Sequence, residues 1–171
     1  CGLRIGGIVT DNQDYHKKAV SEYTANLCAN VIGQEIFGAL AHESHDDLKS
    51  WYNSQRNYYQ PIMKVLRKSL MKEVPGLIVT KPEAAIYLLI DFRNICDKSF
   101  DAKDFVSYCA SEGKVKINGQ YFTLLLAPMN GFYAEPDKGK TQMRIAMVEP
   151  SSLIEKTSLL LKELYQSYQR K

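Results

Sequence analysis

The stretch CGLRIGGIVT, residues 1–10, decides how the rest of this sequence is interpreted. Its branched apolar residues predict a β-strand over residues 3–10, and the arginine Arg4 stands among them. A strand needs a neighbouring strand for its backbone hydrogen bonds. The stretch therefore poses two questions, namely what pairs with this strand and what Arg4 binds.

The composition is typical of one folded domain of ordinary size. The 171 residues are 45% hydrophobic and 24% charged, and the net charge of +3 is too small to indicate a nucleic-acid partner. Since no apolar run approaches the roughly 20 residues of a membrane helix, we expect no membrane partner either. The four cysteines (Cys1, Cys28, Cys96, Cys109) never form C-x-x-C, which fits reduced thiols and predicts a cytoplasmic protein.

Hydrophobic periodicity divides the chain into three parts. Residues 1–45 combine the strand with helical sequence, for which Asp11 or Asn12 is a suitable N-cap, and they look like part of something larger. Residues 46–74 predict a connecting helix, in which Pro61 indicates either a kink or the junction of two helices. Residues 75–171 predict a compact α+β domain.

This third part alternates short strands with helices. Strands are predicted within residues 77–80, 85–92, 114–117 and 142–148, a helix within 99–113, and a turn at Asn118–Gly119. A closing helix is expected within 149–171, beginning with the capping box Ser152-x-x-Glu155.

Three motifs suggest ligands but favour simpler explanations. HESHDD, residues 42–47, lacks a completing set of metal ligands and is expected to be a polar helix end. DKGKT, residues 137–141, has Ala134 where a phosphate-binding loop needs glycine, and a strand follows it, so a flexible loop is expected. KVKINGQYF, residues 114–122, does not match the RNA-recognition signature.

Two arginines interrupt otherwise apolar strands, Arg4 and Arg144. The period of two puts Arg144 on one face with Gln142 and Ala146, so it could simply face solvent. An arginine also presents a planar fork of donors that matches a carboxylate or a phosphate. Spacing alone leaves both interpretations open.

Four segments, in order, resemble class I, fold type I pyridoxal-phosphate aminotransferases of the aspartate aminotransferase kind. Residues 1–10 resemble the family's C-G-x-R-I-G, and residues 82–92 resemble P-x-G-A-x-Y-x-x-x-D/N, with Ala84 where glycine is common. Residues 112–122 resemble E-x-G-V-x-V-x-P-G-x-x-F, with Asn118 in place of proline, and residues 142–150 resemble the R-I-A strand before the final helix.

The resemblance implies an α/β fold, the C-terminal part of a fold type I transferase. It makes residues 1–45 the end of the large cofactor-binding domain, residues 46–74 the connecting helix and residues 75–171 the complete small α+β domain. In the family, the lysine that binds the cofactor covalently stands eight residues before the arginine at Arg4, and thus upstream of Cys1. We therefore expect no catalytic residue in this chain, no activity from it alone, and a missing N-terminal half of the same protein.

The resemblance also assigns roles and partners. Arg4 matches the arginine that binds the phosphate of pyridoxal 5'-phosphate, and Arg144 matches the one that binds the substrate α-carboxylate, so both are expected to converge on one pocket. Amino acids and 2-oxo acids are the implied substrates, and the implied assembly is a homodimer.

Three functions stay open. The first is an aspartate aminotransferase-like enzyme, although no arginine between Ile5 and Gln55 is present to bind a second carboxylate, so either the missing half binds it or the substrate is not dicarboxylic. The second is another fold type I enzyme, such as a carbon–sulfur lyase or a synthase. The third is an interaction module that binds no cofactor.

Overall fold

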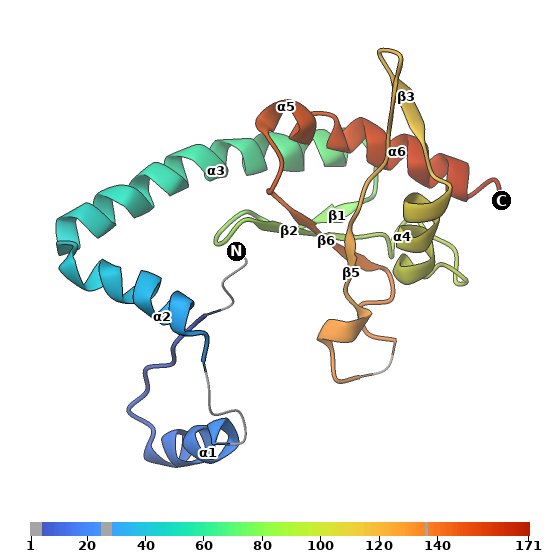
Figure 1. Ribbon diagram of the computed structural model, residues 1–171. Helices are drawn as coiled ribbons and strands as arrows, with labels where there is room; N and C mark the ends of the chain where they lie inside the picture. Colours follow the sequence, from blue (N-terminus) through green and yellow to red (C-terminus); the bar gives the residue numbers. More distant parts are fainter. Residues whose placement is uncertain (1–4, 25–28, 136) are drawn as a thin grey trace. The chain divides into compact units, whose positions relative to one another are not determined.

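The computed structural model describes residues 5–24, 29–135 and 137–171 (Figure 1). The chain divides into two compact units, residues 1–53 and residues 54–171. The first unit contains the helices α1 (Gln13–Tyr23) and α2 (Val31–Gly38) and the short 3-10 helix η1 (Ala39–His42). The Asn12 side chain accepts a hydrogen bond from Tyr15 N over 2.9 Å, which confirms it as the N-cap of α1.

The strand predicted over residues 3–10 is not formed in its described part, residues 5–10. Within the ranges that the structure describes, no strand pairs with this segment, and Ile8 and Val9 are exposed. Branched residues favour a strand, but a strand without hydrogen-bonded neighbours has no stable partner for its backbone.

Helix α3 (His45–Glu73) runs from the first unit into the second. Pro61 lies inside it, so of the two alternatives at this position the junction of two helices is wrong. Of its apolar side chains, Met63, Leu66 and Leu70 are buried, whereas Trp51 and Tyr58 are exposed. The apolar side chains of α3 are therefore covered only in its later turns. Across the described residues, no helix is both long and apolar enough to cross a bilayer.

The second unit contains a four-stranded antiparallel sheet in the order β1-β2-β6-β5. The strands are β1 (Ile78–Val79), β2 (Tyr87–Asp91), β5 (Ala127–Pro128) and β6 (Gln142–Ala146). Alternating residues of β2 and β6 point to opposite faces, and Leu88, Ile90, Met143 and Ile145 form the buried core face.

Helices cover the core face. The end of α3 and helix α6 (Thr157–Tyr168) are joined by the hydroxyls of Ser69 and Ser158, 2.6 Å apart, and by the ion pair between Lys162 Nζ and Glu73, 3.1 Å. Helix α4 (Ala102–Ser111), capped by Asp101, completes the core with an aromatic cluster that includes Phe92, Phe100, Phe105 and Tyr165.

The closing helix is broken, contrary to the prediction of one helix. A short α5 (Ser151–Ile154) precedes α6, and no side chain caps either helix. The predicted capping box fails because Pro150 occupies the N-cap position, which places Ser152 inside the first turn, where its hydroxyl cannot cap.

Outside the sheet, β3 (Val115–Ile117) and β4 (Gln120–Phe122) form a separate hairpin. Asn118 and Gly119 have φ of +49° and +84°, which confirms the predicted turn. Proline, fixed near φ −65°, cannot occupy position 118 in this turn. The 3-10 helix η2 (Asn130–Phe132) lies between β5 and β6.

Candidate functional site

The sheet face opposite the core carries the polar residues of β2 and β6. Asp91 pairs with Gln142 and Leu89 with Arg144 across the two strands. These residues share a face because side chains alternate along a strand. The η2 turn lies on the other side of the sheet from α6 (Figure 1). On this face Arg144 lies beside the η2 loop.

Arg144 is half-buried and contacts two aromatic rings. Its guanidinium carbon lies 4.3 Å from the centroid of Tyr87 and 5.2 Å from that of Phe132. Its Nε is buried and has no hydrogen-bond partner, and within the described residues the guanidinium takes part in no ion pair. A buried unpaired donor is costly. The charge of the guanidinium is also left without a carboxylate partner among the described residues, which suits it to an external anion.

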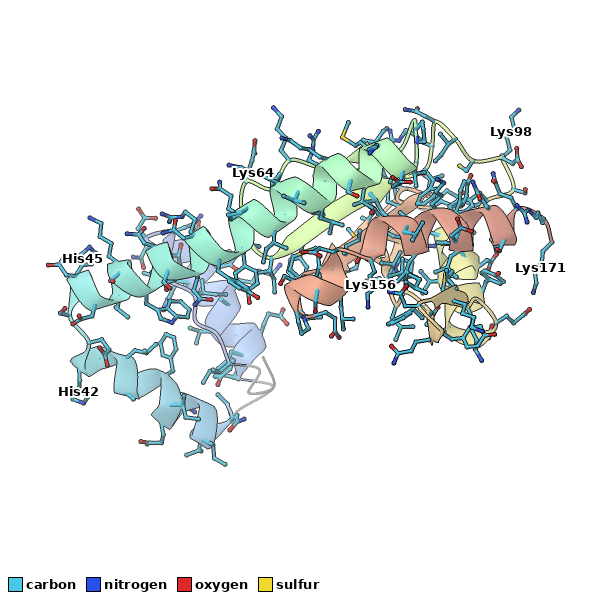
Figure 2. The ribbon with its side chains drawn as sticks, turned by 90° about the horizontal axis from the view of Figure 1, so that it is seen from above. His42, His45, Lys64, Lys98, Lys156 and Lys171 are labelled. Atoms are coloured by element: carbon cyan, nitrogen blue, oxygen red, sulfur yellow. The ribbon has the colours of Figure 1, made fainter. Side chains whose placement is uncertain are left out.

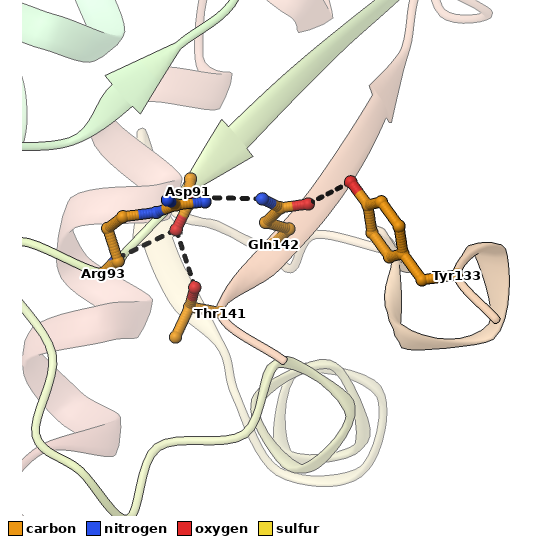
Figure 3. Close-up of polar contacts among 5 residues, drawn as sticks. All are labelled: Asp91, Arg93, Tyr133, Thr141 and Gln142. Carbon is orange, nitrogen blue, oxygen red and sulfur yellow. Dashed lines mark hydrogen bonds and ion pairs between the residues drawn. The ribbon is translucent and has the colours of Figure 1, made fainter. Parts of the chain in front are cut away.

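A hydrogen-bond network next to Arg144 is centred on the carboxylate of Asp91, which is only 2% exposed. Thr141 Oγ1 donates to Asp91 Oδ1 over 2.7 Å, and Gln142 Nε2 donates to Asp91 Oδ2 over 2.9 Å. Arg93 Nε donates to Oδ2 over 2.7 Å and its NH2 group completes an ion pair (Figure 3). The network continues to the loop through Tyr133, whose hydroxyl donates to Gln142 Oε1 over 2.6 Å.

These contacts determine the charge state of Asp91. Burial raises the pKa of its carboxyl, but the hydrogen bonds from Arg93, Thr141 and Gln142 outweigh burial and lower the pKa below its ordinary value. The same carboxylate raises the pKa of Arg93. Asp91 is therefore an ionised structural anchor that Arg93 already neutralises, and it does not compete for Arg144.

A pocket of about 620 Å³ opens beside Arg144. Its walls are the segment 122–127, the segment 144–149 and residues of α5 and α6. Apolar side chains such as Leu125, Met147 and Leu160 line most of it, and Lys156 and Glu149 also belong to its lining. Arg144 is thus one of the lining residues of a mostly apolar pocket, an arrangement that suits a small organic anion.

Of the two predicted site residues, Arg144 lies in the site just described and Arg4 lies outside the described residues. Their expected convergence on one pocket stays a prediction. His42 and His45, labelled in Figure 2, are not part of a metal-binding group in the described residues, where no cluster of three ligands exists. Residues 137–141 form a turn that leads into β6, while the flexibility expected for DKGKT stays a prediction.

Sequence patterns do not assign four further residues to this site: Tyr87, Asp91, Phe132 and Tyr133. One signal could have found Asp91, because an acidic residue ending an apolar strand must be paired when it is buried. Gln142 was placed on the correct face, but its burial could not be deduced from the period of two. No pattern in the sequence connects Phe132 and Tyr133 with β6.

Comparisons with known proteins identify the family of this fold. A family model described as "Aminotransferase class I and II" matches residues 1–153. The chain therefore belongs to the class I and II aminotransferases.

Solved structures share the fold. The chain is similar to the α-aminoadipate aminotransferase LysN of Thermus thermophilus, with a TM-score of 0.68 and 16% identity, covering 98% of this chain and 38% of that one. It is similar to the kynurenine aminotransferase of Pyrococcus horikoshii, with a TM-score of 0.67 and 22% identity, covering 99% and 37%. These structures are described as complexes with N-(5'-phosphopyridoxyl)-L-leucine and with PMP, respectively.

One curated relative also matches. It is the "Probable aspartate/prephenate aminotransferase" of Aquifex aeolicus (strain VF5), 28% identical over 97 residues, which are 57% of this chain and 24% of that protein. The chain thus spans less than two fifths of the length of each of these three relatives.

Proposed function

We propose that this chain is the C-terminal part of a pyridoxal-phosphate-dependent amino-acid transaminase of the aspartate aminotransferase kind. Membership in the family and the share of its relatives that the chain covers support this proposal. The curated relative named for aspartate supports the substrate class. The observation that carries the proposal is that Arg144, whose guanidinium is in no ion pair with a described residue, is among the residues that line an open pocket.

Arg144 is assigned to the α-carboxylate of the amino acid. A carboxylate accepts two parallel hydrogen bonds from a guanidinium, and that of Arg144 is in no ion pair with a described residue. Tyr87 and Phe132 contact the guanidinium through their rings and leave its edge donors unused. Arg144 therefore binds and orients the substrate, and it sets which bond at the α-carbon faces the reacting groups.

The cofactor is assigned to groups beyond the described residues. When bound, pyridoxal phosphate supplies an electron sink for bond cleavage at the α-carbon of the amino acid. Arg4 is assigned to its phosphate, and the lysine that holds it is expected before Cys1. A bidentate arginine suits a phosphate for the same reason that it suits a carboxylate.

The proposal also covers the cellular compartment, the oligomeric state and the second substrate of the enzyme. We assign it to the cytoplasm, because Cys96 and Cys109 are both free thiols. A homodimer is proposed, with a 2-oxo acid as the second substrate.

The experiment compares the complete protein with its Arg144→Lys and Arg170→Lys variants, incubated with aspartate and 2-oxoglutarate. A transaminase forms glutamate and a new oxo acid, whereas a lyase or a synthase does not. Because one ammonium cannot replace the two-pronged fork, Arg144→Lys should lower kcat/KM about 10- to 100-fold. Arg170 is exposed near the C-terminus, so its variant should match the parent.

Two results would contradict the proposal. Equal kcat/KM in the Arg144→Lys variant and its parent would make Arg144 a surface residue. Consumption of aspartate without formation of glutamate would remove the transaminase assignment and favour another reaction on the same fold.

A further inference from the structure

Arg144 depends on few groups for its orientation. Its Nε has no partner, and within the described residues its guanidinium stacks on the rings of Tyr87 and Phe132. An arginine side chain has several rotatable bonds, so a fork that must meet a carboxylate needs such contacts to hold it.

The two rings differ in how they are supported. Tyr87 belongs to β2 and pairs with Ala146 in the sheet. Phe132 ends the short η2 turn and is 58% exposed, so little packing holds it. Its position must therefore come from the backbone and from its neighbours in the loop.

The loop is tied to β6 at two points on either side of Phe132. Met129 N donates to the carbonyl oxygen of Gln142 over 3.0 Å, and the Tyr133 hydroxyl donates to the side chain of Gln142 over 2.6 Å. The Tyr133 ring also lies against Gly139, where a Cβ atom would come within 2.6 Å of it. Both ends of the turn are thus held, and Phe132 lies between them.

Gln142 can act as a tie because it is itself held. It is buried, and its amide nitrogen donates to Asp91, so its amide oxygen is directed to Tyr133 (Figure 3). Gln142 and Arg144 are two residues apart on the same face of β6. The group that fixes the loop and the group that the loop contacts therefore belong to one rigid strand.

We propose that Phe132 is a positioning residue for Arg144, and that the hydrogen bonds from Tyr133 through Gln142 to Asp91 hold Phe132 over the guanidinium. The inference rests on the proposed function, because it assigns Arg144 to a carboxylate. It predicts that the Tyr133 hydroxyl affects ligand binding only indirectly, by fixing the position of the Phe132 ring.

The test measures dissociation constants of maleate, a dicarboxylate that does not react, for the complete protein by calorimetry. Phe132→Leu should raise Kd about two- to fivefold, the range for an exposed cation–π contact. Phe132→Tyr should restore the parent value because it keeps the ring. Tyr133→Phe should also raise Kd about two- to fivefold, while Tyr121→Phe, which removes an exposed hydroxyl elsewhere, should not. Thermal unfolding of each variant verifies that it is folded.

A double-mutant cycle tests the hierarchy. If Tyr133 acts through Phe132, the double variant Phe132→Leu/Tyr133→Phe should have the same Kd for maleate as Phe132→Leu alone. Independent effects would instead multiply the two increases in Kd. Multiplied effects would overturn the hierarchy, and unchanged Kd values in both single variants would overturn the inference.

The Arg144→Lys variant distinguishes a failure of the positioning inference from a failure of the proposed function. If it weakens maleate binding while the Phe132 and Tyr133 variants do not, only the positioning inference fails. If Arg144→Lys leaves Kd unchanged, or maleate does not bind the parent protein, the assignment of Arg144 to a carboxylate fails and this inference fails with it.

Discussion

Asp91 and Gln142 face each other across β2 and β6, and Gln142 Nε2 donates to Asp91 Oδ2 over 2.9 Å. This pair joins the centre of the sheet to the loop that carries Phe132, and it is the buried polar element of a site that otherwise consists of rings and one arginine. It stabilises the fold and holds the candidate site at the same time.

Replacing Asp91 should therefore destabilise the second unit. In Asp91→Asn an amide with two donors meets the donors of Arg93, Thr141 and Gln142, so the free energy of unfolding should fall by about 2–4 kcal/mol. Urea unfolding followed by circular dichroism measures the loss. Asp97→Asn is the matched control, since Asp97 is exposed, and it should change stability by less than about 0.5 kcal/mol.

The same carboxylate should make stability depend on acid. Its folded-state pKa lies below the ordinary value of 3.8, so its contribution is present above that pH and is lost as the pH falls through the folded-state pKa. The stability difference between the parent and Asp91→Asn should be constant near neutrality and shrink below about pH 4. A difference that stays constant down to about pH 2 would show that the pKa of Asp91 does not govern it.

Replacing Ala85 with glycine should stabilise the folded chain. It has φ of +58°, a conformation that costs an L-residue about 1–2 kcal/mol, and it is exposed at the entrance to β2. Ala85→Gly should raise the free energy of unfolding by about 0.5–1 kcal/mol after the added freedom of the unfolded chain is subtracted. Ala84→Gly is the control, because Ala84 is not in the left-handed region, and it should lower stability. Equal effects at both positions would contradict this prediction.

Cys109 should be inert in the folded protein. The thiol is 2% exposed, and burial raises its pKa to about 12. Since the thiolate is the reactive form, iodoacetamide at about pH 8 should modify Cys109 roughly a hundredfold more slowly, or slower still, in the native chain than in urea. Peptide mapping separates it from the other cysteines, and rapid native labelling would indicate that α4 opens locally.

Much of the second unit could be predicted because its signals are local. The Asn118–Gly119 turn, the strand over Gln142–Ala146 and the helix capped by Asp101 follow from residue types within a few positions. The helix break after Ile154 could not, because the apolar pattern of residues 149–171 reads as one helix, and local sequence left two alternatives at Pro61.

The candidate site was predictable only in outline. The period of two placed Arg144 on the face opposite Met143 and Ile145, and the burial of those two residues confirms that face. Its aromatic neighbours come from β2 and η2, which are distant in sequence, and only the fold brings them to β6. The role of Arg144 stays a prediction, as does that of Arg4.

A single residue, Met143, lies between Gln142 and Arg144 on β6, and this spacing restricts how the sequence can change in length. Inserting a single residue between Gln142 and Arg144 would turn every later side chain of β6 to the opposite face of the sheet. The guanidinium would then point into the hydrocarbon interior, and a methionine would point outward. Insertions and deletions among homologues should consequently gather in the loop before Thr141, while β6 keeps a constant length.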